Sequence, residues 1–431
     1  MSDIFKLDRE RRKLEQAITD EACKYSDLVP DDIGRAVIEG LSRELEDMSK
    51  GRNIVEFDCA GRPHVMVVMP NSDKMRYSSL SLNNALFDSS DSTLTYNLHE
   101  AFIVDGSAVD ALLIDKYKFG RVAGVNYPCS LYGLAPAYGG GGFTVSPDGV
   151  ISKVVSVNGS TVNSGGTKIH MLTLAEYKLF ALLAARYAFQ CHGNTSRGRD
   201  DRDANVYGKL CGYNYIGQRI HTANGSGSMR WYSDGSPFGV SDLVGGAMEW
   251  ISDARLKDGE LQKFKDNNAA NPALTASDFA ESSSKWMAIG TDGAYHTPTD
   301  GGTENCYKFD YTADVSTTTS YMGGAVTLCT TMQNKQVSSS PYWGVSLGSL
   351  PNRDSVTICS LLRILGFAPL LKSTPRGTFF GRNTGARAVG CGGYWGYGSY
   401  DGLGCMDCND ERSNAGNGYS ARSASYRKKI S

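Results

Sequence analysis

The stretch from Cys391 to Ser420 restricts most strongly what this chain can fold into, because twenty-four of its thirty residues are Gly, Tyr, Cys, Ser, Asp or Asn. Gly, Ser, Asp and Asn favour turns and loops, since they tolerate positive φ or bond to their own backbone. That preference does not explain four tyrosines and three cysteines among them. All six residue types can be reached from the two asparagine codons by changing only the first two bases, whereas Trp395, Met406 and Glu411 cannot. We call residues 391–420 the variable tract.

The variable tract has the composition of a binding surface. Tyr supplies large and rigid contact area at a low entropic cost, and Ser, Gly and Asn adapt their hydrogen bonds to different targets. We therefore expect an exposed contact surface made of Tyr394, Gly396, Tyr397, Ser399, Tyr400, Asp401, Gly404, Cys405, Asp407, Cys408 and Asp410. Trp395, Leu403 and Met406 are expected to point inward as anchors between them.

Length and charge limit the class of protein. A chain of 431 residues exceeds a single small core, so two domains, or one domain with long insertions, are expected. Its hydrophobic content of 41% and charged content of 21% are typical of a globular protein. A formal net charge of −2 gives no general attraction for nucleic acid or anionic lipid. The expected partner is therefore a protein or a glycan, and not a nucleic acid.

Cysteine usage and the N-terminus bear on location. The eleven cysteines are an odd number without a repeating framework, so mostly free thiols made in a reducing compartment are expected. Met1–Asp20 is charged throughout and lacks the apolar stretch of a secretion signal. Even Tyr177–Phe189 is interrupted by Lys178 and Arg186, so no apolar run reaches the roughly 20 residues needed to cross a bilayer. We expect a soluble protein without membrane insertion. If it acts outside a cell, it must leave by lysis or inside a particle.

Two helices are predicted at the start of the chain. The first covers about Asp8–Tyr25 and carries a narrow apolar stripe at Leu14, Ile18 and Ala22. The second begins after Pro30, with Asp31 or Asp32 as N-cap, and ends at Gly51. Its expected apolar face consists of Ile33, Val37, Leu41 and Leu45. Such stripes indicate packing against the next domain, and an oligomer contact is the alternative.

Later segments predict one more helix and one long strand. Residues 54–114 shift towards a period of two, which indicates a small β-rich module. Thr173 and Glu176 form a capping-box pattern before a core helix over Leu174–Phe189. Val356–Leu371 is apolar, and we expect a central strand with a bulge or an end near Pro369.

Three segments, in order, resemble the motifs of one family. His170–Tyr177, continuing to Ala184–Arg186, resembles the Arg-Leu-Pro-Thr-Glu-Ala-Glu-Trp…Ala-Ala-Arg helix of the formylglycine-generating-enzyme type of C-type lectin fold. Phe238–Trp250 is similar to that family's Gly-Leu-Tyr-Asp-Met-Xaa-Gly-Asn-Val-Trp-Glu-Trp. The closing Arg-Gly-Gly-Ser-Trp…Ala-Arg-Ser-Asn…Gly-Phe-Arg pattern is matched by Arg387, Gly392–Trp395, Arg412–Asn414 and Arg422. This closing pattern around a hypervariable stretch is typical of the variable proteins of diversity-generating retroelements.

The resemblance implies an α+β fold and a division of the chain. Residues 1–52 are expected to be an N-terminal helical segment, and residues 53–95 the small β-rich module. Residues 96–431 are expected to form a C-type lectin-like ligand-binding domain. This domain has an insertion at about 255–355 and the variable region at about 388–422.

Several residues take expected structural roles from the resemblance. Trp250 and Trp395 are large enough to anchor a core with few regular elements, and Glu249 is placed to accept hydrogen bonds from neighbouring loops. The chain departs from the family at Gly246 and Met248, where Asn and Trp are usual. It departs again at Ser420-Ala421, where Gly-Phe is usual.

Part of this fold family is catalytic, but the sequence predicts no enzyme here. Formylglycine-generating enzymes bind copper with a Cys-Xaa4-Cys pair, and Cys391 is followed instead by Gly-Gly-Tyr-Trp-Gly. Cys405 and Cys408 have the spacing of a zinc or redox pair, yet no second pair or nearby histidine completes four ligands. Asp407–Asp410 lacks the spacing of a calcium loop. We expect no cofactor, and the sequence does not locate the structural calcium ion that a lectin-type fold allows.

These observations lead to one function hypothesis and two alternatives. The chain is expected to be a retroelement-diversified receptor-binding protein, the tip adhesin of a bacteriophage tail fibre that attaches to a protein or glycan on a bacterial surface. By analogy with phage tropism determinants it would be a homotrimer, made in the host cytoplasm without a signal peptide and carried in the virion. The alternatives are a formylglycine-generating-enzyme-like oxidoreductase and a structural virion protein.

Overall fold

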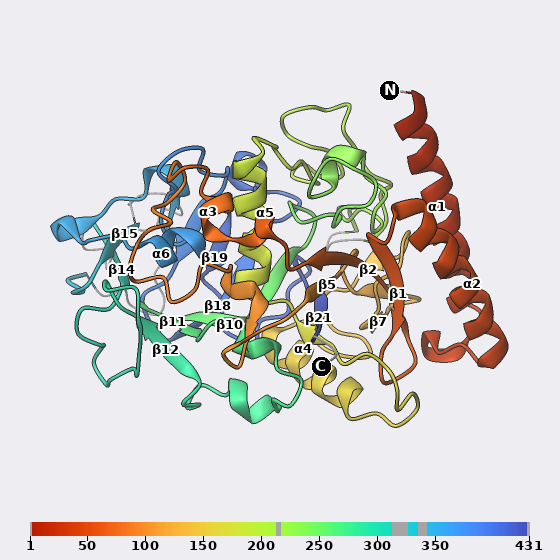
Figure 1. Cartoon of the computed structure of the whole chain (residues 1–431), viewed down its shortest axis with the longest axis horizontal. Helices are drawn as coiled ribbons and strands as arrows, with labels where there is room; N and C mark the ends of the chain where they lie inside the picture. The colour runs from red at the N-terminus through yellow and green to blue at the C-terminus, as the bar shows by residue number, and fades with distance from the viewer. Residues whose placement is uncertain (1, 213–216, 313–325, 335–342, 429–431) are drawn as a thin grey trace.

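The computed structural model describes residues 2–212, 217–312, 326–334 and 343–428. Its architecture is mixed α+β, with helices beside two main β-sheets (Figure 1). The α-helices of the described residues are α1 (Ser2–Ala22), α2 (Asp32–Ser49), α3 (Tyr77–Leu80), α4 (Pro147–Asn158), α5 (Leu174–Arg186) and α6 (Ser360–Ile364). None of these helices combines the length and apolarity that crossing a membrane requires.

The first sheet joins the two ends of the chain. Its described strands follow the order β1 (Asn53–Phe57), β2 (Pro63–Pro70), β5 (Ala111–Asp115), β21 (Ser423–Arg427) and β9 (His170–Met171). All neighbouring strands of this sheet are antiparallel. β21 pairs with β5 on one edge and β9 on the other, so it is an interior strand. The strands of residues 53–70, predicted as part of a small module, therefore share a sheet with the last strand of the chain.

The second sheet is larger. Its described order is β13 (Tyr295–His296), β12 (Trp286–Ile289), β11 (Glu260–Phe264), β10 (Met248–Lys257), β18 (Ala386–Cys391), β19 (Met406–Cys408), β17 (Thr378–Gly381) and β16 (Trp343–Ser346). Beside this path, β14 (Lys308–Tyr311) pairs with β11 and β15 (Val326–Cys329), and β20 (Tyr419–Ser420) pairs with β10. Most strands of the predicted insertion thus extend this sheet, although residues 313–325 and 335–342 of it lie outside the described residues.

Short pairings complete the described strands. β3 (Ile103–Val104) pairs with β4 (Ser107–Ala108), and β6 (Gly120–Val122) pairs with both β7 (Val125–Tyr127) and β8 (Ala135–Pro136). The main hydrophobic core lies between α5, α6 and the second sheet, and includes Leu179, Ile251, Leu362 and Val389. This core lies beneath the strands that carry the variable tract.

Two predicted helix starts are confirmed. Asp31 is the N-cap of α2, and its Oδ1 accepts a hydrogen bond from the Gly34 amide at 2.8 Å. At α5 the Thr173 hydroxyl accepts from the Glu176 amide at 3.2 Å, and the Glu176 carboxylate accepts from the Thr173 amide at 3.0 Å. Both caps satisfy backbone amides that have no partner inside the helix.

The N-terminal helices pack against the first sheet. Leu14, Ile18 and Ala22 of α1 are buried, as predicted, in a cluster that includes Phe57 and Val65 of β1 and β2. Helix α1 begins at Ser2, earlier than the predicted start near Asp8. The predicted packing role of this stripe is therefore confirmed for α1.

The predicted apolar face of α2 is partly wrong. Ile33 and Val37 are 76% and 43% exposed, whereas the neighbouring Ile38 is buried. A Cβ atom on Gly34 would lie 2.4 Å from the hydroxyl of Tyr25. Tyr25 therefore packs directly against the backbone of α2 at Gly34, and Ile38 and Leu45 are the apolar residues of α2 that are fully buried.

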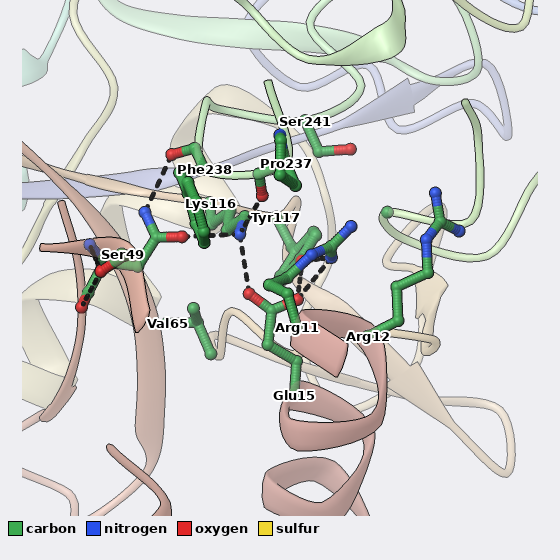
Figure 2. Close-up of polar contacts among 12 residues, drawn as sticks. Arg11, Arg12, Glu15, Ser49, Val65, Lys116, Tyr117, Pro237, Phe238 and Ser241 are labelled. Carbon is green, nitrogen blue, oxygen red and sulfur yellow. Dashed lines mark hydrogen bonds and ion pairs between the residues drawn. The ribbon is translucent and has the colours of Figure 1, made fainter. Parts of the chain in front are cut away.

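A buried ionic cluster fixes α1 to the body (Figure 2). Glu15 accepts hydrogen bonds from Arg11 at 2.5 Å and from the Lys116 ammonium at 2.7 Å, and all three side chains are fully buried. Lys116 also donates to Asn53 Oδ1 at 2.7 Å and to the Pro237 carbonyl at 2.8 Å. Burial lowers the pKa of Lys116 to about 7. Burial also disfavours the Glu15 carboxylate, yet Arg11 and Lys116 hold its pKa below the ordinary value.

The strand predicted over Val356–Leu371 is wrong. Residues 360–364 form the short helix α6, in which Leu361, Leu362 and Ile364 are buried in the main core. A run that is apolar on every side has no periodicity that separates a strand from a helix. Its conformation therefore depends on the elements packed around it.

Candidate ligand-binding surface

The variable tract connects interior strands of the two sheets. It leaves β18, which pairs with β10 on one edge and with β19 on the other. It returns through β19 and the short strand β20, and then leads into β21, the interior strand of the first sheet. Both ends of the tract are therefore held by hydrogen-bonded strands.

Backbone hydrogen bonds hold the loop between β18 and β19. The Trp395 amide donates to the Gly246 carbonyl at 2.9 Å, and the Trp395 carbonyl accepts from the Arg197 amide at 2.8 Å. The Gly398 amide donates to the Thr195 carbonyl at 3.0 Å. These contacts use main-chain atoms only, so the side chains of the loop can change without losing them.

An aromatic cluster lies on this loop. The ring centroids of Tyr394 and Tyr397 are 4.1 Å apart, and those of Tyr394 and Trp395 are 5.2 Å apart in an edge-to-face arrangement. Phe380 of β17 lies under the cluster, at 5.1 Å from Tyr397 and 6.1 Å from Tyr400. Tyr400 is 40% exposed, and Tyr394, Trp395 and Tyr397 are half-buried. The cluster thus presents part of each ring to solvent above a buried aromatic support.

Six of the eleven predicted contact residues reach the surface. Gly396, Ser399 and Tyr400 are exposed, and Tyr394, Tyr397 and Asp410 are half-buried. The inward positions of Leu403 and Met406 are confirmed, whereas the predicted anchor Trp395 is only half-buried.

Five residues that were predicted to be exposed are buried, and this part of the prediction is wrong. They are Asp401, Gly404, Cys405, Asp407 and Cys408. Strand β19 pairs with β18 on one edge and β17 on the other, so Met406–Cys408 runs inside the sheet. Just before it, a Cβ atom on Gly404 would lie 2.4 Å from the Pro375 carbonyl oxygen. The tract therefore enters the body of the protein at this point.

The buried carboxyl groups support the surface from below. Burial raises the pKa of Asp407 to about 7, and its carboxylate accepts from the Tyr397 hydroxyl and from the Asn409 amide, both at 3.0 Å. Burial also raises the pKa of Asp401 well above its ordinary value. Asp410 accepts a hydrogen bond from the Tyr419 hydroxyl. Asp407 and Asp410 thus position tyrosine rings of the same tract.

Arg376 is a supporting residue that sequence reasoning missed. Its guanidinium donates to the Gly398 carbonyl at 2.7 Å and to the Ser399 carbonyl at 3.0 Å, which holds the short 3₁₀ helix η9 (Gly398–Tyr400). It also pairs with Asp201 at 2.7 Å. Residues 197–203, a run of mixed charge, are thereby tied to the variable tract. This ion pair could not be predicted from the sequence, because Arg376 and Asp201 are far apart along the chain.

The predicted role of Glu249 is confirmed. Its carboxylate accepts from the guanidinium of Arg422 at 2.8 Å and 2.9 Å, and both side chains are fully buried. Arg422 also donates to the carbonyls of Asp115, Lys116 and Ser241. The pair therefore joins the second sheet to the start of β21.

Trp250 anchors the end of the tract. Its indole is buried and stacks on Tyr419 with ring centroids 4.2 Å apart and planes at 12°. The indole Nε1 donates to the Val145 carbonyl at 3.2 Å. The anchoring role expected for Trp250 is confirmed.

The cysteines are all free thiols, and each of the eleven lies in the described part of the chain. Burial raises the pKa of both Cys405 and Cys408 well above the ordinary value. Among the described residues, no group of three or more His, Cys, Asp or Glu side chains is arranged to hold a metal ion.

A small cavity lies beside the tract. It has a volume of about 250 Å³ and is lined by the C-terminal end of α5, by residues 373–376 and by Gly402 and Leu403. Arg202 and Arg376 also line it, and both form ion pairs with neighbouring aspartates.

Comparison with known proteins adds no assignment, since no protein-family model and no curated protein matches this chain.

Proposed function

We propose that this chain is a diversified ligand-binding protein, in which a C-type lectin-like domain of the formylglycine-generating-enzyme type displays the variable tract. The observation that carries the proposal is a half-exposed aromatic cluster on a loop that main-chain hydrogen bonds hold in place. A loop of this kind can exchange side chains and keep its shape. Rigidity also limits the entropy lost on binding.

The contact surface in this proposal is smaller than the sequence predicts. It consists of Tyr394, Gly396, Tyr397, Ser399 and Tyr400, with Trp395 at its edge. Aromatic side chains near the centre of such a surface supply most of the binding energy. The buried residues of the tract support this surface and make no ligand contact.

The proposed setting is the tip of a bacteriophage tail fibre, with a protein or glycan on a bacterial surface as ligand. A homotrimer would raise overall affinity through avidity, because binding at one site concentrates the others near their targets. A reverse transcriptase gene beside this gene, with a near-copy of its 3′ end that differs mainly at adenines, would support diversification.

Replacing three tyrosines tests the proposed surface. The triple variant Tyr394→Ala, Tyr397→Ala, Tyr400→Ala is expected to lose at least ten-fold in affinity for the bacterial strain that binds the unchanged protein most strongly, measured by cell-adhesion titration over a strain panel. The matched control is Tyr187→Ala with Tyr207→Ala, since these tyrosines are 57% and 66% exposed elsewhere. Equal adhesion by the triple variant and the control would rule out the surface.

A further inference from the structure

A wide polar groove lies on the second sheet, outside the variable tract. Its volume is about 1070 Å³, and its described lining comes from β10, β11, β12 and the loops 281–284, 297–305 and 330–333. In Figure 1 these strands lie at the end of the molecule away from α1 and α2. Small-molecule sites typically occupy roughly 300–1,000 Å³, so the groove has room for an extended ligand of several rings.

The floor of the groove is a row of fixed, planar polar groups. Arg255 and Gln262 face each other across the β10–β11 pair, and the Arg255 Nε donates to the Gln262 side-chain oxygen at 2.8 Å. The Gln262 amide then donates to Glu260 at 2.8 Å. These three side chains are only 3–4% exposed and line the groove. An amide and a guanidinium carry more donors than these bonds use, so Arg255 and Gln262 retain groups that can bond a ligand.

Buried Trp286 holds the row in place. The guanidinium carbon of Arg255 lies 4.3 Å from the centroid of the Trp286 ring, and that of Arg412 lies 5.7 Å from it. The indole is 1% exposed, so it supports the floor and offers no stacking face. Arg255 is further held by the Glu281 carbonyl, which accepts from it at 2.9 Å.

The charges of the groove select against anions. Five carboxylates and three cations line it: Asp258, Glu260, Glu281, Asp300 and Glu304, with Arg255, Lys257 and Lys308. Lys257 pairs with Glu281, and Lys308 lies 3.7 Å from Glu260. Because negative charge is in excess, the groove disfavours nucleic acids and sulfated or sialylated glycans.

The rim and the small number of apolar side chains in the lining indicate a hydroxyl-rich ligand. Serines and threonines line the edges, among them Ser282, Ser283, Ser284, Thr297, Thr299 and Thr331. A sugar hydroxyl both donates and accepts, so it can bond carboxylate, amide and guanidinium groups in one row. Peptide side chains find little apolar surface here, since Trp286 is buried and Met332 is half-buried.

We propose that this groove is a constant binding site for neutral oligosaccharides, independent of the variable tract. The site would bind a sugar chain through side-chain hydrogen bonds to Arg255, Gln262 and Glu260. It would give every diversified copy of the protein the same secondary ligand.

A glycan-binding measurement on the full chain tests this site. The probes are neutral oligosaccharides of three to six glucose, galactose, mannose or N-acetylglucosamine units, with sialylated and sulfated counterparts. We expect at least one neutral probe to bind with a Kd between micromolar and millimolar, and its acidic counterpart to bind at least ten-fold more weakly. Absence of binding by every neutral probe, or tighter binding of the acidic forms, would overturn the proposal.

Variants locate the binding. Gln262→Ala removes the centre of the floor, and Ser283→Trp obstructs the half-buried rim without touching the floor. Each is expected to weaken binding at least ten-fold, whereas Ser78→Trp, at an exposed position in α3, leaves it unchanged. If Gln262→Ala does not fold, the effect of Ser283→Trp on glycan binding alone tests the site. Binding that survives Ser283→Trp but is lost in the triple tyrosine variant would place the sugar on the variable tract and reject the groove.

Discussion

At the scale of single residues, the variable tract contains two kinds of side chain. Tyr394, Tyr397 and Tyr400 lie partly at the surface, whereas Asp401 and Asp407 are buried beneath them. Tyr397 connects the two layers, because its hydroxyl donates to the Asp407 carboxylate at 3.0 Å. Change at a buried position therefore affects the orientation of a surface ring.

Asp407→Asn is expected to stabilise the protein above neutral pH. Burial raises the pKa of Asp407 to about 7 from its ordinary value of 3.8, so ionising this carboxyl group in the folded protein costs free energy. This cost is absent below pH 3.8, grows as the pH rises towards 7 and is complete above it. The asparagine variant has no such cost. Its free energy of unfolding should exceed that of the unchanged protein by on the order of 1–3 kcal/mol at pH 8 and by less at pH 5.

Urea unfolding at both pH values measures this difference. The exposed Asp20→Asn is the control, and it should change the free energy of unfolding by less than about 0.5 kcal/mol at either pH. A variant Asp407→Asn that is less stable than the unchanged protein at pH 8 would contradict the assignment of a costly buried carboxylate.

At the scale of elements, two strands determine where the tract can vary. β18 and β21 are interior strands of different sheets, and the exposed residues of the tract lie mostly in the loop between β18 and β19. The Glu249–Arg422 pair joins these sheets next to the point where the tract ends. The strands and the ion pair that hold the tract in place thus do not use its exposed side chains.

Arg422→Met is expected to destabilise the protein strongly. It leaves the Glu249 carboxylate buried with the Lys118 ammonium at 3.7 Å as a distant partner, and it removes the donors to three backbone carbonyls. Breaking one side of a buried ion pair costs about 3–5 kcal/mol. The measurement is the free energy of unfolding in urea.

The matched control lies at the far end of β21, the strand that follows Arg422. Arg427 of β21 is 53% exposed and pairs with Glu56, so Arg427→Met should cost less than about 1 kcal/mol. Similar decreases in the free energy of unfolding in the two variants would show that the buried Glu249–Arg422 pair stabilises the protein no more than an exposed ion pair.

At the scale of the whole molecule, the N-terminal helices are part of the body. Helix α1 contributes Leu14, Ile18 and Ala22 to a shared core, and its Glu15 accepts from Lys116 across that interface (Figure 2). The predicted N-terminal helical segment is therefore joined to the sheet that contains the C-terminal strand.

Glu15→Gln is expected to lower the free energy of unfolding by roughly 3 kcal/mol, because it leaves Lys116 buried without its carboxylate partner and Arg11 with the Asp8 carboxylate alone. Glu10→Gln on the same helix is the control, since Glu10 is 45% exposed and pairs with exposed Lys13. It should cost less than about 1 kcal/mol. Thermal unfolding and urea titration check both variants, and equal stability of the two would refute the proposed role of the cluster.

Helix starts were predicted correctly because their signals lie within one turn of the chain. Features that depend on contacts between distant residues were not predicted. Asp31 and Thr173 cap helices as predicted, because a cap needs only residues within one turn. Val356–Leu371 was predicted as a strand and forms α6 with flanking turns, because an apolar run has no periodic signal. The buried face of α2 was partly missed because it depends on packing against α1 and the first sheet, where Ile38 and Leu45 are buried.

The sequence by itself determined the helix caps, the inward Leu403 and Met406, and the presence of a tract with the composition of a binding surface. Only the tertiary structure decided which residues of that tract reach solvent. Exposure depends on strand pairing, and β19 pairs with β17 on one edge and β18 on the other, so Asp407 and Cys408 are buried inside the sheet. Composition indicates that a surface exists, whereas the pairing of β19 with β17 and β18 sets its limits.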